Sequence, residues 1–335
     1  MSTAKIIGVI PGDGIGRDVI AAARVVLDAI AVRFADIAFD YREMDVGEAA
    51  VKRCGSAFPD ATRDGIAGCD AILFGAVGAP HDFVVLSGIR YGFELYANIR
   101  PIKALPGVDV LQPDADMVVI RENTEGLYSG VGYRHGNHHV NLRIFTDHGM
   151  RRIIRFTFEW AVRNGRHKVT LAHKASVLRH TDQPMKDLFY EIAAGYPAVE
   201  ADDMELDACA MRMVMKPQTL DVILAENANG DVLSDVGGGI VGGLGFTPSG
   251  NIGEKLAMFE PIHGSAPKHA DKNVVNPTAT LLATRMMFEY LGRPDVAGRL
   301  QDSIERVLIE GRVRTYDIGG SSSTSQFAQA VADGL

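Results

Sequence analysis

The stretch "IIGVIPGDGIGRDVI", residues 6–20, sets the expectation for the fold of this 335-residue chain. Its first five residues are nearly all apolar, and a glycine-rich turn separates them from a long amphipathic run. In that run, apolar side chains recur every three to four residues from Val19 to Ile30. A short buried strand that leads through a tight turn into a helix is the opening unit of an α/β protein.

Short apolar runs of the same kind recur at residues 71–76, 116–122, 168–174 and 221–227. Helical patterns lie between several of them, such as the one over 150–165, where Gly165 is a suitable C-terminal cap. This alternation predicts an α/β fold with much parallel pairing. In such sheets ligands bind at the carboxyl ends of strands, and several of these runs end on charged residues.

Composition excludes several classes of protein. Hydrophobic residues make up 47% and charged residues 23%, as in ordinary globular enzymes, and the length suits two domains or one large α/β unit. The net charge of −8 argues against general nucleic-acid binding. Three cysteines without a C-x-x-C pair fit a reducing compartment. With no leader pattern and no span of ~20 apolar residues, we expect a cytoplasmic protein that binds neither nucleic acid nor a membrane.

The glycine turn "PGDGIG", residues 11–16, does not match the common phosphate-binding motifs. The dinucleotide fingerprint G-x-G-x-x-G fails because Arg17 stands at its third glycine. No glycine loop is followed by Lys-Ser/Thr, which excludes a Walker A motif. The turn is therefore interpreted as a tight strand-to-helix connection, and any nucleotide would bind by a non-Rossmann route.

Three arginines lie at the ends of apolar runs. Arg90 and Arg100 belong to "IRYGFELYANIRP", and Arg121 belongs to "VIRENTEGLY". The planar guanidinium holds carboxylates with two parallel hydrogen bonds, so three of them near one site would suit a di- or tricarboxylate. Taken singly, each could instead be a surface ion-pair partner.

Three aspartates suggest a cation site. Asp231 and Asp235 are four residues apart in "GDVLSD" and so share one helical face, and Asp207 precedes another apolar helix. Carboxylates without histidine suit a hard divalent cation, Mg²⁺ or Mn²⁺; helix caps or exposed helix charges are the alternative. Lys174, at the end of "KVTLAHK", is either a buried base with a lowered pKa or an ordinary strand-end charge.

Together these strings resemble the β-decarboxylating dehydrogenases that oxidise 3-substituted malates, namely isocitrate, homoisocitrate and 3-isopropylmalate dehydrogenases. The resemblance covers nearly the whole chain and rests on "PGDGIG", "LYANIRP", "VIRENTEGLY", "AHKAS", "LDACAM", "GDVLSD", "GGLGFTPSGNIGE" and "FEPIHGSAPKHADKNVVNP". It implies metal-dependent oxidative decarboxylation to a 2-oxo acid and CO₂ with reduction of NAD(P). The length and "RENTEGLY" are more similar to the homoisocitrate and isocitrate members, with 3-isopropylmalate or another 3-substituted malate as the alternative.

The resemblance also implies an architecture. It is an α/β, isocitrate/isopropylmalate dehydrogenase-like fold of two domains with a mixed sheet, not a Rossmann fold. A large cofactor-binding domain would comprise residues 1–95 and 243–335. A small domain, residues 96–242, would carry the substrate, metal and dimer-interface residues. The chain would form a homodimer with shared active sites, because each site would borrow Lys174 and Asp207 from the partner.

The same resemblance assigns roles to individual residues. It implies that Tyr128 and Lys174 form the acid/base pair. The metal, Mg²⁺ or Mn²⁺, would be held by Asp207, Asp231 and Asp235, and the substrate by Arg90, Arg100, Arg121, Leu86 and Ser87. The implied cofactor residues are Ile15, His263, Gly264, Ser265, Ala266, Lys268, His269, Val275, Asn276 and Tyr316.

The chain departs from its relatives in the segment before Arg90, which contacts the C3 substituent of the malate in the family. Isocitrate enzymes resemble one another in a Ser-x-Asn pattern where this chain has Val84 and Leu86. Homoisocitrate enzymes often have an arginine where this chain has Ser87. Leu86 matches the apolar residue of isopropylmalate enzymes, so the substituent stays open and an apolar one is possible.

A second departure concerns the cofactor. NAD-specific members carry an aspartate directly after "HGSAP", where this chain has Lys268. NADP-dependent isocitrate enzymes are similar to this chain in that lysine, in a ring at His269 and in Tyr316. An arginine four residues after that tyrosine is replaced by Gly320. We predict a preference for NADP over NAD.

Two other classes of function remain open. A non-catalytic regulatory subunit of the same family would be expected to lack Tyr128, Lys174 or one of the aspartates, and all are present. A metal-dependent hydrolase that uses the three aspartates would leave the arginines and Lys268 without a role.

Overall fold

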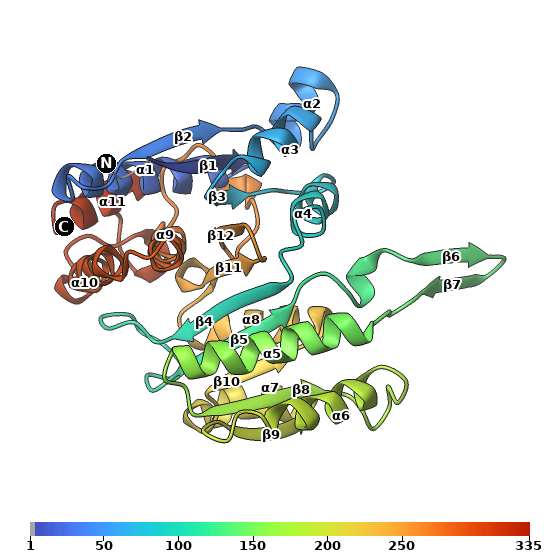
Figure 1. Cartoon of the computed structure of the whole chain (residues 1–335). Helices are drawn as coiled ribbons and strands as arrows, with labels where there is room; N and C mark the ends of the chain where they lie inside the picture. Colours follow the sequence, from blue (N-terminus) through green and yellow to red (C-terminus); the bar gives the residue numbers. More distant parts are fainter. Residues whose placement is uncertain (1–3) are drawn as a thin grey trace. The chain divides into compact units, whose positions relative to one another are not determined.

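The computed structural model describes residues 4–335, which divide into two compact units (Figure 1). The first unit contains the residues up to Glu94, together with Leu105–Val110 and Gly242–Leu335; the second contains Leu95–Ala104 and Leu111–Val241. Each unit has its own strands and its own buried core. The assignment of cofactor binding to the first and of substrate and metal binding to the second stays a prediction.

The first unit contains five strands, in the order β2-β1-β3-β12-β11. Only β11 and β12 pair antiparallel; the other neighbours are parallel. Their bounds are β1 (Lys5–Gly12), β2 (Phe39–Glu43), β3 (Ala71–Ala76), β11 (Pro248–Ile252) and β12 (Ala257–Pro261). The runs expected at 6–10 and 71–76 are confirmed as β1 and β3, and every residue of β3 is buried.

Helices cover the strands of the first unit. The predicted amphipathic run is confirmed as α1, and its apolar face from Val19 to Ile30 is buried. Helix α9 is buried along almost its whole length between strands β11 and β12 and the neighbouring helices. The helices are α1 (Gly16–Arg33), α2 (Gly47–Cys54), α3 (Asp60–Ala67), α4 (Asp82–Arg90), α9 (Thr278–Tyr290), α10 (Pro294–Glu310) and α11 (Thr324–Ala332), with short 3-10 turns η3 (Leu244–Phe246), η4 (Pro267–His269) and η5 (Tyr316–Ile318).

The glycine turn after β1 allows two distant segments to approach closely. Gly12 and Gly14 have positive φ of 70° and 58°, which other residues adopt at a cost. A Cβ on Gly14 would lie 2.0 Å from the carbonyl oxygen of Ser265. That carbonyl accepts a hydrogen bond of 2.8 Å from the Ile15 N–H. The turn therefore holds the loop after β12 against the end of β1, which is a role in close packing.

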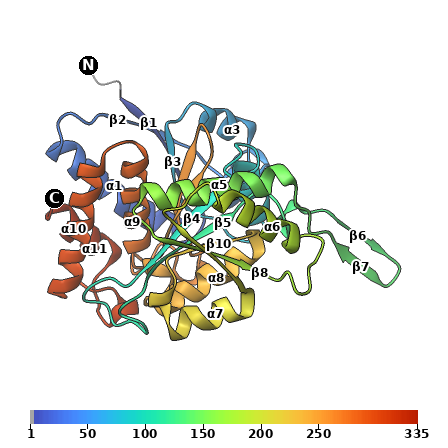
Figure 2. The same cartoon turned by 60° about the horizontal axis from the view of Figure 1, so that its bottom comes forward.

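The second unit contains five strands in the order β4-β5-β10-β8-β9. β4 and β5 are antiparallel and the remaining neighbours are parallel, so each unit is mixed, as predicted. The strands are β4 (Ala97–Lys103), β5 (Asp116–Glu122), β8 (Lys168–His173), β9 (Glu200–Glu205) and β10 (Val222–Ala225). A separate exposed hairpin, β6 (Gly132–His135) and β7 (His138–Asn141), projects from this unit (Figure 2).

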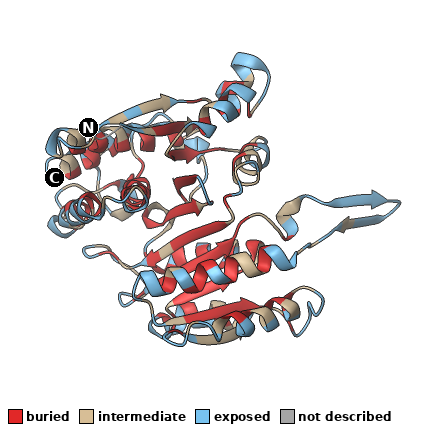
Figure 3. Ribbon diagram, viewed as in Figure 1, coloured by how far each residue is buried: buried red, intermediate tan, exposed pale blue. Residues whose placement is uncertain are grey.

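Helices pack on both sides of these strands. They are α5 (Asp147–Arg163), α6 (Asp182–Ala193), α7 (Leu206–Met215) and α8 (Asn227–Ile240), with 3-10 turns η1 (Leu127–Ser129) and η2 (Pro217–Thr219). Helix α5, expected over 150–165, begins three residues earlier because the Thr146 side chain caps it by accepting the Gly149 N–H. Figure 3 shows the buried strands and the alternation of buried and exposed residues along α5.

Helices α7 and α8 bury their apolar sides in one core cluster with β4, β5 and β10. Cys209 lies in this cluster, and burial raises the pKa of its thiol to about 12, as expected for a small apolar core residue. No helix within residues 4–335 has the length and apolar character to cross a membrane.

Candidate active site

Four of the predicted site residues converge in the second unit. The carboxylate of Asp231, on α8, lies at the centre. Its Oδ1 is 3.2 Å from Arg100 Nη1 on β4 and also accepts a hydrogen bond from Arg121 Nη1 on β5. Its Oδ2 accepts a hydrogen bond of 2.7 Å from the Tyr128 hydroxyl on η1. Arg100 and Arg121 are 5% and 1% exposed, so this carboxylate offsets two buried cations.

Side chains that the sequence reasoning did not single out hold these arginines in place. Asn227 Oδ1 accepts hydrogen bonds from Arg121 Nε (3.1 Å) and Nη2 (2.6 Å). Ser234 Oγ accepts one from Arg100 Nη1 (2.6 Å). Both residues are on α8, one turn before and one turn after Asp231, which puts all three on one helical face. The spacing of polar residues in "NANGDVLSD" was the signal that could have identified them.

Tyr128 is held in its protonated form. Burial raises the pKa of the phenol above its ordinary value, and the hydrogen bond to Asp231 raises it further. The guanidinium of Arg121 lies 5.1 Å from the centre of the tyrosine ring. An ordinary phenol is already protonated at neutral pH, and a raised pKa makes it a weaker acid, so the role of Tyr128 as the acid stays a prediction.

The two aspartates of α8 share one face, as predicted. Asp235 lies one turn after Asp231 and is exposed. Partial desolvation by surrounding side chains nevertheless raises the pKa of its carboxyl. Carboxylate oxygens are the ligands that Mg²⁺ and Mn²⁺ prefer, so the chemistry of this pair fits such a cation.

The third predicted metal ligand, Asp207, does not join this pair within one chain. In residues 4–335, no three His, Cys, Asp or Glu side chains gather around a point that could hold a metal ion. A hard cation takes about six oxygen ligands. The two aspartates of α8 are therefore an incomplete site in a single chain, and the contribution of Asp207 from a partner stays a prediction.

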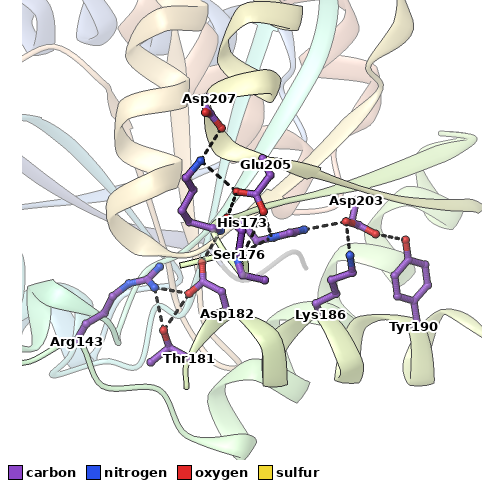
Figure 4. A network of polar contacts seen from close by, with 12 residues as sticks. Arg143, His173, Ser176, Thr181, Asp182, Lys186, Tyr190, Asp203, Glu205 and Asp207 are labelled. Atoms are coloured by element: carbon purple, nitrogen blue, oxygen red, sulfur yellow. Dashed lines mark hydrogen bonds and ion pairs between the residues drawn. The ribbon is translucent and has the colours of Figure 1, made fainter. Parts of the chain in front are cut away.

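Lys174, directly after β8, contacts the carboxylates of Asp207 and Glu205, which are labelled in Figure 4. Its Nζ is 2.8 Å from Asp207 Oδ1 and 3.1 Å from Glu205 Oε2. These contacts raise the pKa of Lys174, and the contact with Asp207 has the larger effect. The side chain is 32% exposed. The alternative that Lys174 is a buried base with a lowered pKa is therefore wrong for the single chain, because two anions stabilise its charged form.

Strand β9, beside Lys174, is held by a second polar group that Figure 4 also shows. Asp203 accepts hydrogen bonds from Lys186 Nζ (2.7 Å) and Tyr190, and its Oδ2 lies 2.8 Å from His173 Nε2. Burial acts against ionisation, but these partners lower the pKa of Asp203 to about 2. The strand that precedes Asp207 is thus anchored by a carboxylate that stays ionised at neutral pH.

Arg90 belongs to the first unit, at the end of α4. Its Nη2 lies 2.9 Å from Glu260 Oε1. Its Nε is buried and has no hydrogen-bond partner among residues 4–335, which leaves a donor suited to a carboxylate. Leu86 and Ser87 lie on the same helix and are half-buried. Binding of substrate by these three residues stays a prediction.

The loop after β12 contains a buried acceptor that has no partner. His263 Nδ1 is 3.1 Å from the Gly264 carbonyl oxygen, so this nitrogen carries the hydrogen and Nε2 is an acceptor. Nε2 is buried, and no partner reaches it within the described part of the chain. Burial lowers the pKa of His263, which keeps it neutral. An orphaned acceptor beside the exposed Gly264 and Ala266 fits the amino group of a nucleotide base.

The next turn of this loop carries Lys268 and His269 in η4. The His269 ring stacks on Tyr316, with ring centres 5.6 Å apart and planes inclined by 17°. Lys268 is exposed. The nearby acid, Asp271, is held by a two-pronged ion pair with Arg17, at 2.7 and 3.1 Å. The structure thus brings three of the predicted cofactor residues together.

Two further predicted cofactor residues, Ile15 and Val275, are buried in one small apolar cluster. Asn276 is 6% exposed, and its amide is occupied at both ends. Its Nδ2 donates to Asp317 (3.0 Å), and its Oδ1 accepts from Thr278. The side chain of Asn276 therefore holds the loop, and contacts of these residues with a cofactor stay predictions.

Comparison with known proteins extends the match to the whole chain. Residues 6–331 match the family model described as isocitrate/isopropylmalate dehydrogenase. The chain belongs to this family. The predicted class of enzyme, a decarboxylating dehydrogenase of 2-hydroxy acids, and the predicted α/β fold are confirmed. Enzymes of this family act on 3-substituted malates and generally use NAD(P) and a divalent metal ion.

Individual relatives differ in the substrate that they are named for. The chain is 44% identical to the 3-isopropylmalate dehydrogenase of Methanothermobacter thermautotrophicus, over 97% of both chains. It is 40% identical to the isocitrate/homoisocitrate dehydrogenase of Thermus thermophilus, also over 97% of both. The solved structure of isocitrate dehydrogenase from Methylococcus capsulatus matches with a TM-score of 0.94 at 39% identity, covering 98% of this chain and 99% of that one.

Of the two sequence relatives, the 3-isopropylmalate dehydrogenase is the more similar, at 44% against 40% identity, which fits the 3-isopropylmalate alternative better than the homoisocitrate or isocitrate interpretation. Chain length does not discriminate between them, because enzymes of both kinds align over the same 97% of their length. The motif "RENTEGLY" runs from Arg121 to Tyr128 and does not include the segment before Arg90. It therefore carries little information about the C3 substituent.

Replacement of Tyr128 by phenylalanine tests its role as proton donor. We expect kcat to fall by about 10²–10⁴-fold, the usual contribution of a positioned acid, with little change in KM for the substrate. Tyr133→Phe, on the exposed strand β6, is the matched control and should leave both constants unchanged. Equal kcat for Tyr128→Phe and the parent enzyme would exclude this role.

Proposed function

We propose that this enzyme oxidatively decarboxylates a malate with an apolar substituent at C3, 3-isopropylmalate in the first place, with NADP and Mg²⁺ or Mn²⁺. The apolar substituent is inferred from the surface of α4 before Arg90. Between Asp82 and Arg90 this helix has no charged side chain, and Phe83 and Val84 are each 53% exposed. The relatives named for 3-isopropylmalate support the same substrate.

The physical argument compares an alkyl group with a third carboxylate. An apolar group gains about 0.8 kcal/mol per buried carbon, so an isopropyl group gains about 2 kcal/mol against an apolar surface. The extra carboxylate of isocitrate or homoisocitrate would lose water without a cation to offset its charge, which is unfavourable. Leu86 and Ser87 supply no cation for it. The apolar substituent is therefore favoured.

Binding of the malate carboxylates would rearrange the charges around α8. Without substrate, the Asp231 carboxylate balances Arg100 and Arg121. Carboxylates of the substrate would replace it as partners of the two guanidiniums, since these groups match in geometry and charge. Asp231 would then be available, with Asp235, to hold the cation.

The chain's own residues account for the proton transfers. A bound nicotinamide cofactor would supply the acceptor for a hydride from C2 of the substrate, and a bound cation would offset negative charge on the substrate oxygens. Lys174 takes up the hydroxyl proton at Nζ, which requires its neutral form. If Asp207 bound the metal cation, it would no longer pair with Lys174. The lysine would then lose the contact that raises its pKa most. Tyr128 donates its phenolic proton to the carbon that has lost CO₂.

The incomplete pair of aspartates supports a homodimer with shared sites. In one chain Asp207 and Lys174 pair with each other, while Asp231 and Tyr128 form a separate group. A second copy that offers its Asp207 and Lys174 to this group would supply the missing ligand and the missing base together. An exchange of the same two residues in both directions is what a two-fold dimer provides.

The preference for NADP rests on Lys268. Its ammonium is exposed beside the stacked rings of His269 and Tyr316, and the charge of Asp271 is offset by Arg17. A charge-assisted contact with the 2′-phosphate contributes about 1.5–3 kcal/mol. That corresponds to a preference of roughly ten- to a hundredfold for NADP over NAD.

The substrate is tested with a panel of isocitrate, homoisocitrate, 3-isopropylmalate, D-malate and tartrate, each with Mn²⁺ and NADP or NAD. We expect the highest kcat/KM with 3-isopropylmalate. The double variant Val84→Ser/Leu86→Asn should lower this value by about tenfold or more, since a single lost methylene contact costs about 1–3 kcal/mol, and should raise kcat/KM with isocitrate. A higher kcat/KM of the parent enzyme with isocitrate would contradict the proposed apolar substituent. If none of the substrates in the panel led to reduction of the cofactor, the proposal of a dehydrogenase for these malates would be contradicted.

Mixing of two inactive variants tests the shared sites. Tyr128→Phe and Lys174→Met chains are unfolded and refolded together. When equal amounts of the two chains pair at random, about half of the dimers are mixed. If each site combines Tyr128 of one chain with Lys174 of the other, every mixed dimer has one intact site. About a quarter of the parent activity should then return. Activity that stays at the residual level of the separate variants, with mixed dimers present by native mass spectrometry, would contradict shared sites.

Lys268→Asp tests the cofactor preference. We expect KM for NADP to rise by about ten- to a hundredfold, because the contact with the 2′-phosphate is replaced by repulsion, and the preference to shift toward NAD. Lys255→Asp makes the same change of charge in the turn between β11 and β12 and should leave the preference unchanged. An unchanged KM for NADP in Lys268→Asp would show that this lysine does not bind the phosphate.

A further inference from the structure

A buried arginine joins the two parts of the second unit that carry the predicted chemistry. Arg143 lies between β7 and α5, and its side chain is 12% exposed. Its Nη1 donates hydrogen bonds to Asp182 Oδ1 and to Thr181 Oγ1 (3.0 Å), as Figure 4 shows. Its Nη2 lies 3.1 Å from Glu226 Oε1. Asp182 and Glu226 are each 2% exposed, so one cation serves two buried carboxylates.

The first carboxylate fixes the backbone of Lys174. Asp182 is the first residue of α6, and its Oδ2 accepts a hydrogen bond of 2.7 Å from the Lys174 N–H. Its other oxygen is bound by Arg143. The position from which the lysine side chain extends is therefore set by a carboxylate that Arg143 orients.

The second carboxylate fixes the start of α8. Glu226 is the N-cap of this helix: its Oε1 accepts the Asn229 N–H (2.8 Å) and its Oε2 the Ala228 N–H (3.2 Å). Helix α8 carries Asp231 and Asp235. Arg143 thus bridges the carboxylates at the N-termini of two helices, one beside Lys174 and one that presents the predicted metal ligands.

We propose that Arg143 is a positioning residue that holds in place both the start of α8 and the backbone of Lys174, an inference that rests on the proposed function of Asp231, Asp235 and Lys174 in the shared sites. The planar fork is essential to it, because Nη1 hydrogen-bonds one carboxylate while Nη2, which makes no hydrogen bond among residues 4–335, forms an ion pair with the other. The Phe145 ring lies against the guanidinium, with its centre 4.7 Å from the Arg143 Cζ. A lysine at this place would keep the charge and lose the fork.

Without Arg143 two buried carboxylates face each other uncompensated. The repulsion would move the two helix N-termini apart or draw water between them. Both consequences displace Lys174 and the aspartates of α8. The cofactor residues His263, Lys268 and Tyr316 belong to the first unit and would be unaffected.

The test compares Arg143→Lys and Arg143→Gln with the control Arg151→Gln. Arg151 lies on α5, the helix that follows Arg143, and pairs with Glu191 on the surface (2.7 Å). We expect both Arg143 variants to bind Mn²⁺ at least about tenfold more weakly, as for residues that orient metal ligands. The affinity is measured by titrating the full-length protein with Mn²⁺ and monitoring the electron paramagnetic resonance signal. We also expect kcat to fall by about 10- to 100-fold. Binding of NADP should stay within about twofold of the parent, and the control should match the parent throughout.

Binding of Mn²⁺ and kcat within twofold of the parent in a folded Arg143→Lys protein would overturn the proposal. So would a loss of Mn²⁺ and NADP binding in equal proportion, which indicates unfolding rather than positioning. Should Arg143→Gln fail to fold, the proposal is tested with Arg143→Lys and with the separate variants Asp182→Asn and Glu226→Gln. Their binding constants for Mn²⁺ and for NADP are compared in the same way. The Mn²⁺ titration needs no turnover, so it separates this inference from a failure of the proposed reaction.

Discussion

The charge balance around Asp231 is the constraint on which the second unit depends. Two guanidiniums, almost without exposure to water, come from the antiparallel strands β4 and β5 and meet one carboxylate of α8. Buried cations are tolerated only where an anion and further acceptors satisfy them, and Asn227 and Ser234 on the same helix complete the set. The helix must therefore lie across these strands with this face inward.

The polar neighbours extend this constraint outward. Glu226 caps the helix whose face binds the arginines, and Arg143 ties that cap to Asp182, which holds the Lys174 backbone. Beyond Lys174, Asp203 anchors β9 through Lys186 and His173. Glu226 and Asp182 lie at the N-termini of helices and Asp203 lies within β9, and each has at least two partners. The reactive groups of the unit are thus held by a polar framework beneath them rather than by apolar packing alone.

The first unit depends on close approach of backbone segments. The turn after β1 has glycines where Ala76 and Ser265 carbonyls leave no room for a Cβ. The loop after β12 then runs from the orphaned His263 acceptor to the stacked His269 and Tyr316 rings. Residues more than 240 positions apart, such as Ile15 and Ser265, are joined by one backbone hydrogen bond, and this contact shapes the surface proposed to bind the cofactor.

Periodicity and the order of the motifs predicted the α/β class, the strands β1, β3, β5, β8 and β10, the helices α1 and α5, and the types of residue in the candidate site. They are local properties: buried strands need apolar runs and amphipathic helices need a stripe. Strand β9 was missed because its residues are mostly acidic, and it is stabilised by pairing with β8 and by ion pairs such as that of Lys168 with Glu200. Tertiary contact alone decided that Lys174 is paired with Asp207 and Glu205, that Asn227 and Ser234 orient the arginines, and that Arg143 joins Asp182 to Glu226. The reason is that a charged group's state depends on which groups surround it in space, and those groups come from distant parts of the chain.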